Sequence, residues 1–440
     1  MKRINLPISF FAFLVVATSV MPGCKKDFSN PNAAPEDEVF TSARGMTAVG
    51  VGLQRKYSYS RAGDVYNIVT ANGFTTNELL LMNAGNTAEA QLSVGGTAVD
   101  PTNTILANIW ANGSKIILDA NRIITAAPTI TDPNYVSALT GYATIFKAQA
   151  LGSLAMFWEK VPDTSGILQV TFSDRMLGYQ RAIASIDKAL ALIAADSISA
   201  NFALNIPPGT NIKQTLLALK ARYAVFSGDW DNALAAANAV DLTVKSTMNF
   251  DGASPNPIFE TATATNNVYQ VIDSTFGLPE GLRPENSDKR VQFYTLLNTQ
   301  LSPDKPVPPR FRINGFGVAT ATSYPYYVPG EMTLIKAEVY ARKNQLPDAI
   351  AEINKIRTKK AADDPFGIGA DESPYAGAVT QDAVLTEIYR QRCIELYMQG
   401  FKLEDSRRFD RPIAEKKRNF FPYPFAERDN NSNTPPDPLF

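Results

Sequence analysis

A pattern of two helices joined by a short turn occurs twice in this chain and limits the folds that it can adopt. In the first unit, apolar residues recur at helical spacing on both sides of Gly228 and Asp229. Glycine favours the end of a helix, because it takes the left-handed conformation without a Cβ penalty, and aspartate favours the start of the next one. The two stripes consist of Leu216, Leu219, Tyr223 and Phe226, then Ala233, Leu234, Ala237 and Val240. The sequence therefore predicts an αα-hairpin.

The second unit repeats these positions later in the chain. Asn344, which tolerates the left-handed turn, replaces Gly228. The matching residues are Ile335, Ala337 and Val339 for Leu219, Ala221 and Tyr223, and Ala349, Ile350, Ile353 and Asn354 for Ala233, Leu234, Ala237 and Asn238. Small alanines where helices cross are typical of tetratricopeptide-type pairs, so we interpret the two units as an internal repeat. They are not contiguous, which excludes a simple solenoid.

Helical periodicity extends to most of the remaining chain. Further helices are predicted over residues 109–126, 142–158, 177–194 and 383–398. Cys393 lies on the apolar stripe of the last of these, where we expect a buried thiol rather than a reactive one. Residues 72–104 and 241–329 lack the helical period, apart from a short strand predicted near 268–272. The fold class is mainly α, and these two long irregular stretches are where we expect a ligand site.

Composition excludes several classes of function. The 440 residues include no histidine and only two cysteines, Cys24 and Cys393. A Ser-His-Asp triad, a Cys-His pair, an imidazole metal site and a disulfide framework are therefore excluded, and we expect neither a metal nor a cofactor. The 42 basic and 43 acidic residues nearly balance, so there is no charge excess to attract nucleic acid.

The N-terminal residues have the pattern of an export signal. Lys2 and Arg3 precede an apolar run over 8–17, which is too short to span a bilayer. Gly23 directly before Cys24 resembles a bacterial lipobox, and a plain signal peptide is the alternative. We expect a lipoprotein signal peptide over 1–23, lipidation of Cys24, a flexible tether over 24–38 and a single domain over 39–440, with a loop-rich insert at about 241–330.

The segment from 390 to 409 resembles the characteristic helix of the SusD/RagB family of Bacteroidetes. That helix typically contains Glu-Arg, Glu-Leu, Glu-Gly, a basic residue and Asp-Leu-Arg-Arg. The matching residues are Arg392, Glu395, Leu396, Gly400, Lys402, Asp405, Arg407 and Arg408, whereas Gln391 and Gln399 replace Glu and Phe401 replaces a common His. Weaker matches are Trp110 with Asn121, residues 148–162, both helix pairs, and Phe421, Pro422, Pro424, Glu427 and Asn430.

The resemblance implies a SusD-like fold and a non-catalytic lipoprotein on the outer membrane, facing the extracellular side. Such a protein captures a nutrient, usually an oligosaccharide and in some members a peptide, and passes it to a SusC-like TonB-dependent transporter. Aromatic rings and polar groups of the two irregular stretches are the suitable sugar contacts. These candidate binding residues are Phe74, Asn77, Asn83, Tyr269, Arg283, Tyr294, Tyr324, Tyr326 and Tyr327.

Two other classes of function remain open at this point. One is a scaffold that binds proteins through its helix pairs, and the other is a surface glycosidase using two carboxylates, which zero histidine does not forbid. No carboxylate pair stands apart from helix caps and surface faces. The charged residues from Glu395 to Arg408 are interpreted as a structural ion-pair network at a helix end rather than as ligand contacts.

Overall fold

The computed structural model describes residues 36–298 and 310–439. The predicted signal peptide, Cys24 and tether residues 24–35 lie outside this range. The chain divides at Val39 and Phe40 into two units, and the described part of the first is the short helix α2 (Glu36–Val39). None of the helices in the described ranges has the length and apolar character needed to cross a membrane. The remaining paragraphs concern the second unit.

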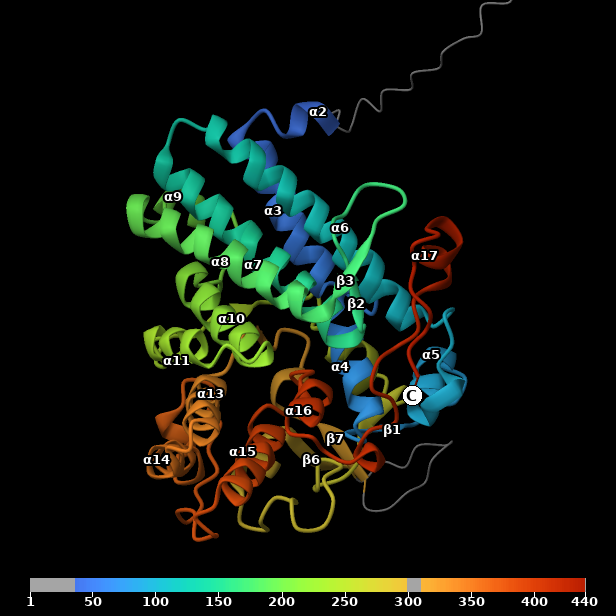
Figure 1. Ribbon diagram of the computed structural model, residues 1–440, viewed down its shortest axis with the longest axis vertical. Helices are drawn as coiled ribbons and strands as arrows, with labels where there is room; N and C mark the ends of the chain where they lie inside the picture. Colours follow the sequence, from blue (N-terminus) through green and yellow to red (C-terminus); the bar gives the residue numbers. More distant parts are fainter. Residues whose placement is uncertain (1–35, 299–309, 440) are drawn as a thin grey trace, which may run out of the picture. The chain divides into compact units, whose positions relative to one another are not determined.

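Five helices of the N-terminal half pack against one another (Figure 1). They are α3 (Ala43–Ser58), α4 (Asp64–Thr75), α6 (Thr104–Ala126), α7 (Pro133–Phe157) and α8 (Arg175–Asp196). The middle helix, α7, packs against both α6 and α8. A helix that is apolar all round belongs in the interior, and nearly every residue of α7 is buried. Lys147 is a half-buried exception.

The two predicted helix pairs are confirmed. They are α10 (Ile212–Phe226) with α11 (Trp230–Ala239), and α13 (Pro329–Arg342) with α14 (Leu346–Arg357). Gly228 has φ +76° and Asn344 has φ +59°, so both turns use the left-handed conformation that the sequence predicted. Asp229 caps α11 by accepting a hydrogen bond from the Asn232 amide. Although the pairs are far apart in sequence, α11 packs directly on α13.

The last predicted helix ends earlier than the periodicity indicated. The helix expected over 383–398 is α15 (Gln381–Glu395), and α16 (Lys402–Arg408) follows it. Between them Met398 and Gly400 have φ of +61° and +82°, and a left-handed backbone ends a helix. The remaining short helices are α5 (Thr87–Val94), α9 (Ala200–Ala203), α12 (Lys289–Tyr294) and α17 (Phe425–Asn430).

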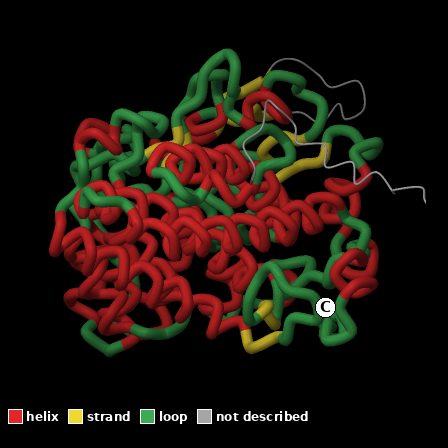
Figure 2. The backbone as a smooth tube through the Cα atoms, turned by 90° about the horizontal axis from the view of Figure 1, so that it is seen from above, coloured by secondary structure: helices red, strands yellow, loops and turns green. Residues whose placement is uncertain are grey.

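Four two-stranded antiparallel sheets lie at the margins of the helices (Figure 2). The pairs are β1 (Leu79–Leu81) with β5 (Tyr269–Val271), β2 (Lys160–Pro162) with β3 (Phe172–Asp174), β4 (Thr247–Met248) with β8 (Tyr324–Pro325), and β6 (Thr295–Asn298) with β7 (Arg310–Ile313). The strand predicted near 268–272 is confirmed as β5. Its partner β1 comes from the other stretch predicted as irregular, so β1–β5 pairing joins the two stretches.

The prediction that residues 72–104 and 241–329 are irregular is wrong in part. The first stretch contains β1 and the two-turn helix α5, and the second contains α12 and the strands β4 to β8. Elements of two to eight residues are too short to show a 3.6-residue or 2-residue period. Short strands and helices therefore escape detection by pattern alone.

Buried ion pairs hold the C-terminal helices to the rest of the unit. Arg392 of α15 binds Asp405 of α16 through two hydrogen bonds of 2.9 and 3.0 Å, and Arg408 binds Glu338 of α13 at 2.8 and 2.9 Å. The predicted structural ion-pair network is confirmed. Cys393 lies in the core as predicted, and burial raises the pKa of its thiol to about 12.

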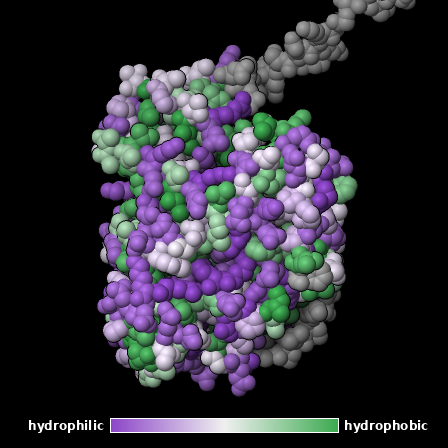
Figure 3. All heavy atoms as spheres, in the orientation of Figure 1, coloured by the Kyte–Doolittle hydropathy of each residue, from purple (hydrophilic) through white to green (hydrophobic). Residues whose placement is uncertain are grey.

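The molecular face in Figure 3 is covered mainly by hydrophilic side chains, with apolar side chains scattered between them. Single apolar residues of this kind are ordinary on a protein surface. We therefore looked for function in pockets rather than in an apolar patch on that face.

Candidate ligand-binding site

A polar surface pocket of about 450 Å³ lies where the N-termini of α4, α5 and α6 meet. We call it the amide pocket. Its walls come from the loop before α4, from the loop leading into α5, and from the first turns of α6. The residues that line it are Arg61, Ala62, Asn67, Gly85, Asn86, Thr87, Ala88, Glu89, Thr104, Ile105 and Asn108. Amide and hydroxyl groups dominate, and the one cation and one carboxylate are paired with each other.

Glu89 is the buried carboxylate of the amide pocket. Its Oε1 accepts hydrogen bonds from Tyr66 Oη at 2.7 Å and from Arg61 Nη2 at 2.5 Å. Among the described residues, Glu89 Oε2 and Asn67 Oδ1 have no hydrogen-bond partner, although both atoms are buried. An unpaired buried acceptor is unfavourable, so a hydrogen-bond donor that reached either oxygen would stabilise it.

Aromatic side chains support this carboxylate from beneath. Burial, together with Tyr269 and Glu89, raises the pKa of Tyr66 well above its usual value, so Tyr66 stays protonated and donates to Glu89. The Tyr66 ring lies 5.9 Å from the ring of Tyr269, which meets Phe74 edge-on at 5.6 Å. Thr70 donates to the Tyr269 hydroxyl at 3.3 Å. Phe74 and Tyr269 thus lie in the layer under the pocket and not on its surface.

The loop before α5 is shaped by Asn83. Its side-chain oxygen accepts from the Gly85 amide at 2.8 Å, and its carbonyl accepts from Asn86 Nδ2 at 3.2 Å. Asn86 stands at the N-cap position of α5 without capping it, and its Oδ1 accepts from Arg61 at 3.2 Å. Asn83 therefore positions the loop that brings Asn86 into the amide pocket.

Three other residues predicted as ligand contacts lie elsewhere. Asn77 is half-buried, with φ +62°, in the turn before β1. Arg283 is exposed, and its carbonyl accepts two hydrogen bonds from Arg390. Tyr294 is buried and donates to the Glu395 carbonyl at 2.6 Å. The structure does not bring these three side chains to the amide pocket.

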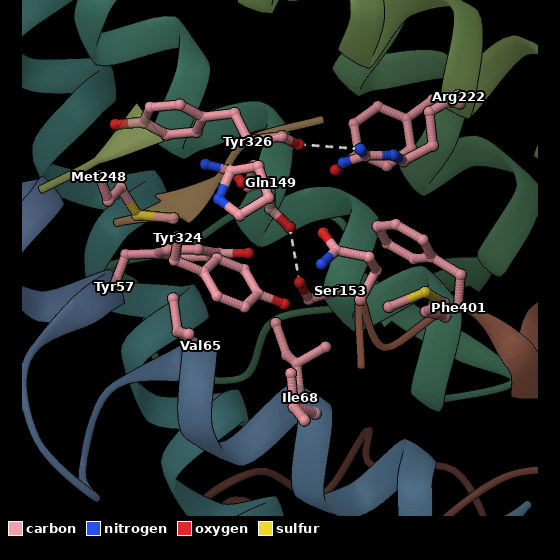
Figure 4. A pocket seen from close by; sticks show the side chains of 15 residues that line it. Tyr57, Val65, Ile68, Gln149, Ser153, Arg222, Met248, Tyr324, Tyr326 and Phe401 are labelled. Carbon is pink, nitrogen blue, oxygen red and sulfur yellow. Dashed lines mark hydrogen bonds between the residues drawn. The ribbon is translucent and has the colours of Figure 1, made fainter. Parts of the chain in front are cut away.

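Tyr324 and Tyr326 line an interior cavity, which Figure 4 shows from close by. Its volume of about 30 Å³ is room for one or two waters. The side-chain nitrogens of Gln149 and Gln399 in its wall lack partners among the described residues, which suits a bound water. Tyr327 lies nearby in sequence but donates to the Val244 carbonyl. The cavity is too small for a sugar.

The prediction from sequence did not include Arg61, Asn86, Glu89 and Asn108, which line the amide pocket. An emphasis on aromatic rings directed it to side chains that the fold buries, whereas the lining of the amide pocket, within the described residues, includes no aromatic ring. The available signal was the run of small and amide residues over 83–87. No group of three or more metal-ligating side chains occurs in the described ranges.

The fold is that of SusD-like proteins. A SusD homologue from Bacteroides thetaiotaomicron superposes with a TM-score of 0.69 at 12% identity, covering 92% of this chain and 99% of that one. A SusD-like carbohydrate binding protein from Bacteroides vulgatus gives 0.63 at 16%, with coverage of 84% and 83%. A laminarin binding SusD-like protein gives 0.60 at 14%, with coverage of 93% and 100%.

The sequence gives the family independently of the fold. Residues 319–437, which contain α13 to α17, match the model of the SusD family. Residues 319–437 therefore belong to the SusD/RagB family, as the segment from 390 to 409 predicted. No curated protein matches the chain.

Proposed function

We propose that this protein is a non-catalytic, glycan-binding surface lipoprotein that captures an oligosaccharide in the amide pocket. It delivers the oligosaccharide to a SusC-like TonB-dependent transporter in the outer membrane. Cys24 carries the lipid anchor, and the domain faces the extracellular side. The observation that carries the proposal is the amide pocket, in a fold shared with proteins described as carbohydrate binding and laminarin binding.

The chemistry of the amide pocket suits a neutral sugar. Sugar hydroxyls both donate and accept, and the pocket offers both functions through Asn86, Asn108 and Thr87. The unpaired oxygens of Glu89 and Asn67 are acceptors for hydroxyl donors. Because Arg61 and Glu89 neutralise each other, the pocket has no net charge that would select an ionic ligand.

Binding is tested by titrating a panel of neutral oligosaccharides, including β-glucan fragments, into the purified protein in a calorimeter. Removal of one side-chain hydrogen bond with Asn108→Ala should weaken binding about tenfold. The matched control is Asn201→Ala, which removes an exposed amide from α9, away from the pocket. Equal affinity of Asn108→Ala and the unaltered protein for every glycan bound would exclude this pocket.

The same incubations distinguish binding from catalysis. A binder returns every oligosaccharide intact after prolonged incubation, whereas a glycosidase releases shorter products that chromatography resolves. Retention with no product supports the proposal. Any cleavage that survives repurification would establish an enzyme instead.

The anchor and the transporter require experiments in cells. Cys24→Ala should release the protein from the membrane fraction or leave its signal unprocessed. A pull-down in mild detergent should recover a large outer-membrane transporter. Unchanged membrane association of Cys24→Ala would refute lipidation, and repeated absence of a transporter would refute the partnership while leaving glycan binding intact.

A further inference from the structure

A second pocket, of about 270 Å³, lies over α7 between α6 and α8. We call it the lysine pocket. Its volume far exceeds the ~10–15 Å³ that one water needs, so it has room for a small organic ligand. The residues that line it are Ile117, Asn121, Lys147, Leu151, Pro162, Asp163, Thr164, Ser165, Arg181, Ala184, Ser185 and Lys188.

Each wall of the lysine pocket follows from helical spacing. Lys147 and Leu151 are four residues apart on α7, and Ile117 and Asn121 are four apart on α6. The loop after β2 closes one end of the pocket. At Gly166 this loop, with φ +83°, comes so close to α6 that a Cβ would lie 2.7 Å from Leu118 Cδ1.

The charges of the lysine pocket do not cancel. Arg181 donates to Asp163 at 2.7 Å and to the Pro162 carbonyl at 3.0 Å, so these two charges neutralise each other. Hydrogen bonds from Ser173, Thr171 and Arg181 outweigh the opposing effect of burial and lower the pKa of Asp163. Its oxygens are therefore already engaged and do not serve the two lysines.

Lys147 and Lys188 provide the excess positive charge. Within the described ranges, neither ammonium group forms an ion pair with a carboxylate. Burial, and secondly the charge of Lys188, lower the pKa of Lys147, which means that the folded protein holds this ammonium at an energetic disadvantage. A half-buried cation that lines a pocket and has no carboxylate partner suits an anionic ligand that enters the pocket.

We propose that the lysine pocket binds an acidic monosaccharide unit, with the carboxylate of a uronic acid held by Lys147 and Lys188. Asn121 and the hydroxyls of Thr164 and Ser165 face the ring hydroxyls of the sugar. Ile117 and Leu151 contact its apolar face. The site is separate from the amide pocket and does not depend on the proposed function.

The test is calorimetric titration of the full chain with glucuronate, with glucose as the neutral match and inorganic phosphate as the bare oxyanion. Glucuronate should bind with a Kd of about 1 mM, as expected for a ligand of its size. Glucose should not bind in this pocket. Lys147→Met should weaken glucuronate binding at least about tenfold.

The matched control is Lys115→Met, which removes the same charge from an exposed position on α6. It should change the affinity by less than about twofold. Lys147→Met is expected to fold, because it removes a desolvated charge and keeps the methylene chain. Its thermal unfolding checks this directly.

Three outcomes would overturn the proposal. The first is that Lys147→Met and Lys115→Met bind glucuronate with equal affinity. The second is that glucose and glucuronate bind equally well and Lys147→Met weakens both. The third is that phosphate binds and glucuronate does not. Asn108→Ala should leave glucuronate binding unchanged, so failure of the glycan site and failure of this site are distinguishable.

Discussion

Glu331→Ala is expected to destabilise the protein strongly, because it leaves the guanidinium of Arg222 buried without a counter-charge. The two side chains are 1% and 4% exposed and form two hydrogen bonds of 2.6 Å each. Arg222 also donates to the Tyr326 carbonyl at 2.9 Å, and Glu331 has no other cationic partner among the described residues. The pair links α10 of the first helix pair to α13 of the second.

The magnitude follows from the cost of an orphaned buried charge. Removing one partner of such a pair costs about 3–5 kcal/mol, a large part of the ~5–15 kcal/mol that stabilises a typical domain. Replacing both partners, as in Arg222→Met with Glu331→Leu, leaves only the Tyr326 carbonyl without its donor, which costs about 1–3 kcal/mol. We therefore expect the double variant to be more stable than Glu331→Ala by about 2 kcal/mol.

The assay is urea unfolding followed by circular dichroism and by tryptophan fluorescence, whose transitions must coincide for the free energies to be compared. The control is Asp119→Ala, which breaks an exposed pair with Lys115 and should change the free energy of unfolding by less than about 0.5 kcal/mol. If Glu331→Ala and the double variant have the same stability, the buried charge is not the cause and the reasoning fails.

Three further predictions concern the two turn residues, a buried carboxyl and a buried thiol. Both turn residues have positive φ, which disfavours a side chain with a Cβ. Gly228→Ala should therefore lower the free energy of unfolding by about 1–2 kcal/mol, a cost that comes from the backbone because an added Cβ meets nothing closer than 3.8 Å. Asn344→Gly should raise the free energy of unfolding by up to about 1 kcal/mol, and urea unfolding measures both. Burial raises the pKa of Asp64 well above its usual value, although a hydrogen bond from Asn112 acts in the opposite direction. Ionised Asp64 therefore destabilises the folded state at neutral pH. This loss of folding free energy disappears as the pH falls towards about 3.9, the usual pKa of an unfolded aspartate. Asp64→Asn should therefore raise the melting temperature at pH 7 and lose that advantage near pH 4; a constant difference would contradict the assignment. Burial raises the pKa of the Cys393 thiol to about 12, so this thiol should resist alkylation at pH 8 until denaturant unfolds the chain. Labelling of Cys393 itself in the folded protein, located by peptide mapping, would refute its burial.

Local signals explain which parts of the fold could be predicted. Gly228, Asp229 and Asn344 determine turns through their own conformational preferences, so the helix pairs follow from sequence without knowledge of the rest. The pairing of Leu79 in β1 with Val271 in β5 depends on contacts between distant segments, and no local period encodes it. The same limit explains why the end of α15 at Glu395 was placed too late.

The lining of the proposed ligand site was harder to predict for a related reason. Large aromatic residues in stretches without a clear period can pack on the core instead of facing solvent. Phe74, at the end of α4, and Tyr269, in β5, do so beneath Glu89. Polar residues of the amide pocket come from the starts of three helices, and only the folded chain brings Asn86 and Asn108 together. Position in an irregular stretch therefore indicated the neighbourhood of the pocket but not its contacts.

Helix α6 contributes to both pockets, and its geometry determines whether they can act together. Asn108 lines the amide pocket and Asn121 the lysine pocket, thirteen residues further along α6. At 1.5 Å and about 100° per residue, they are about 20 Å apart along the axis and about 140° apart around it. The two pockets thus open on different sides of α6. They do not form one continuous cleft, so a short glycan cannot occupy both at once. Asn108→Ala and Lys147→Met should therefore have additive effects on the binding of any ligand, because distant sites without shared partners do not couple. Strong coupling in the double variant would mean that one acidic glycan reaches both pockets around the helix.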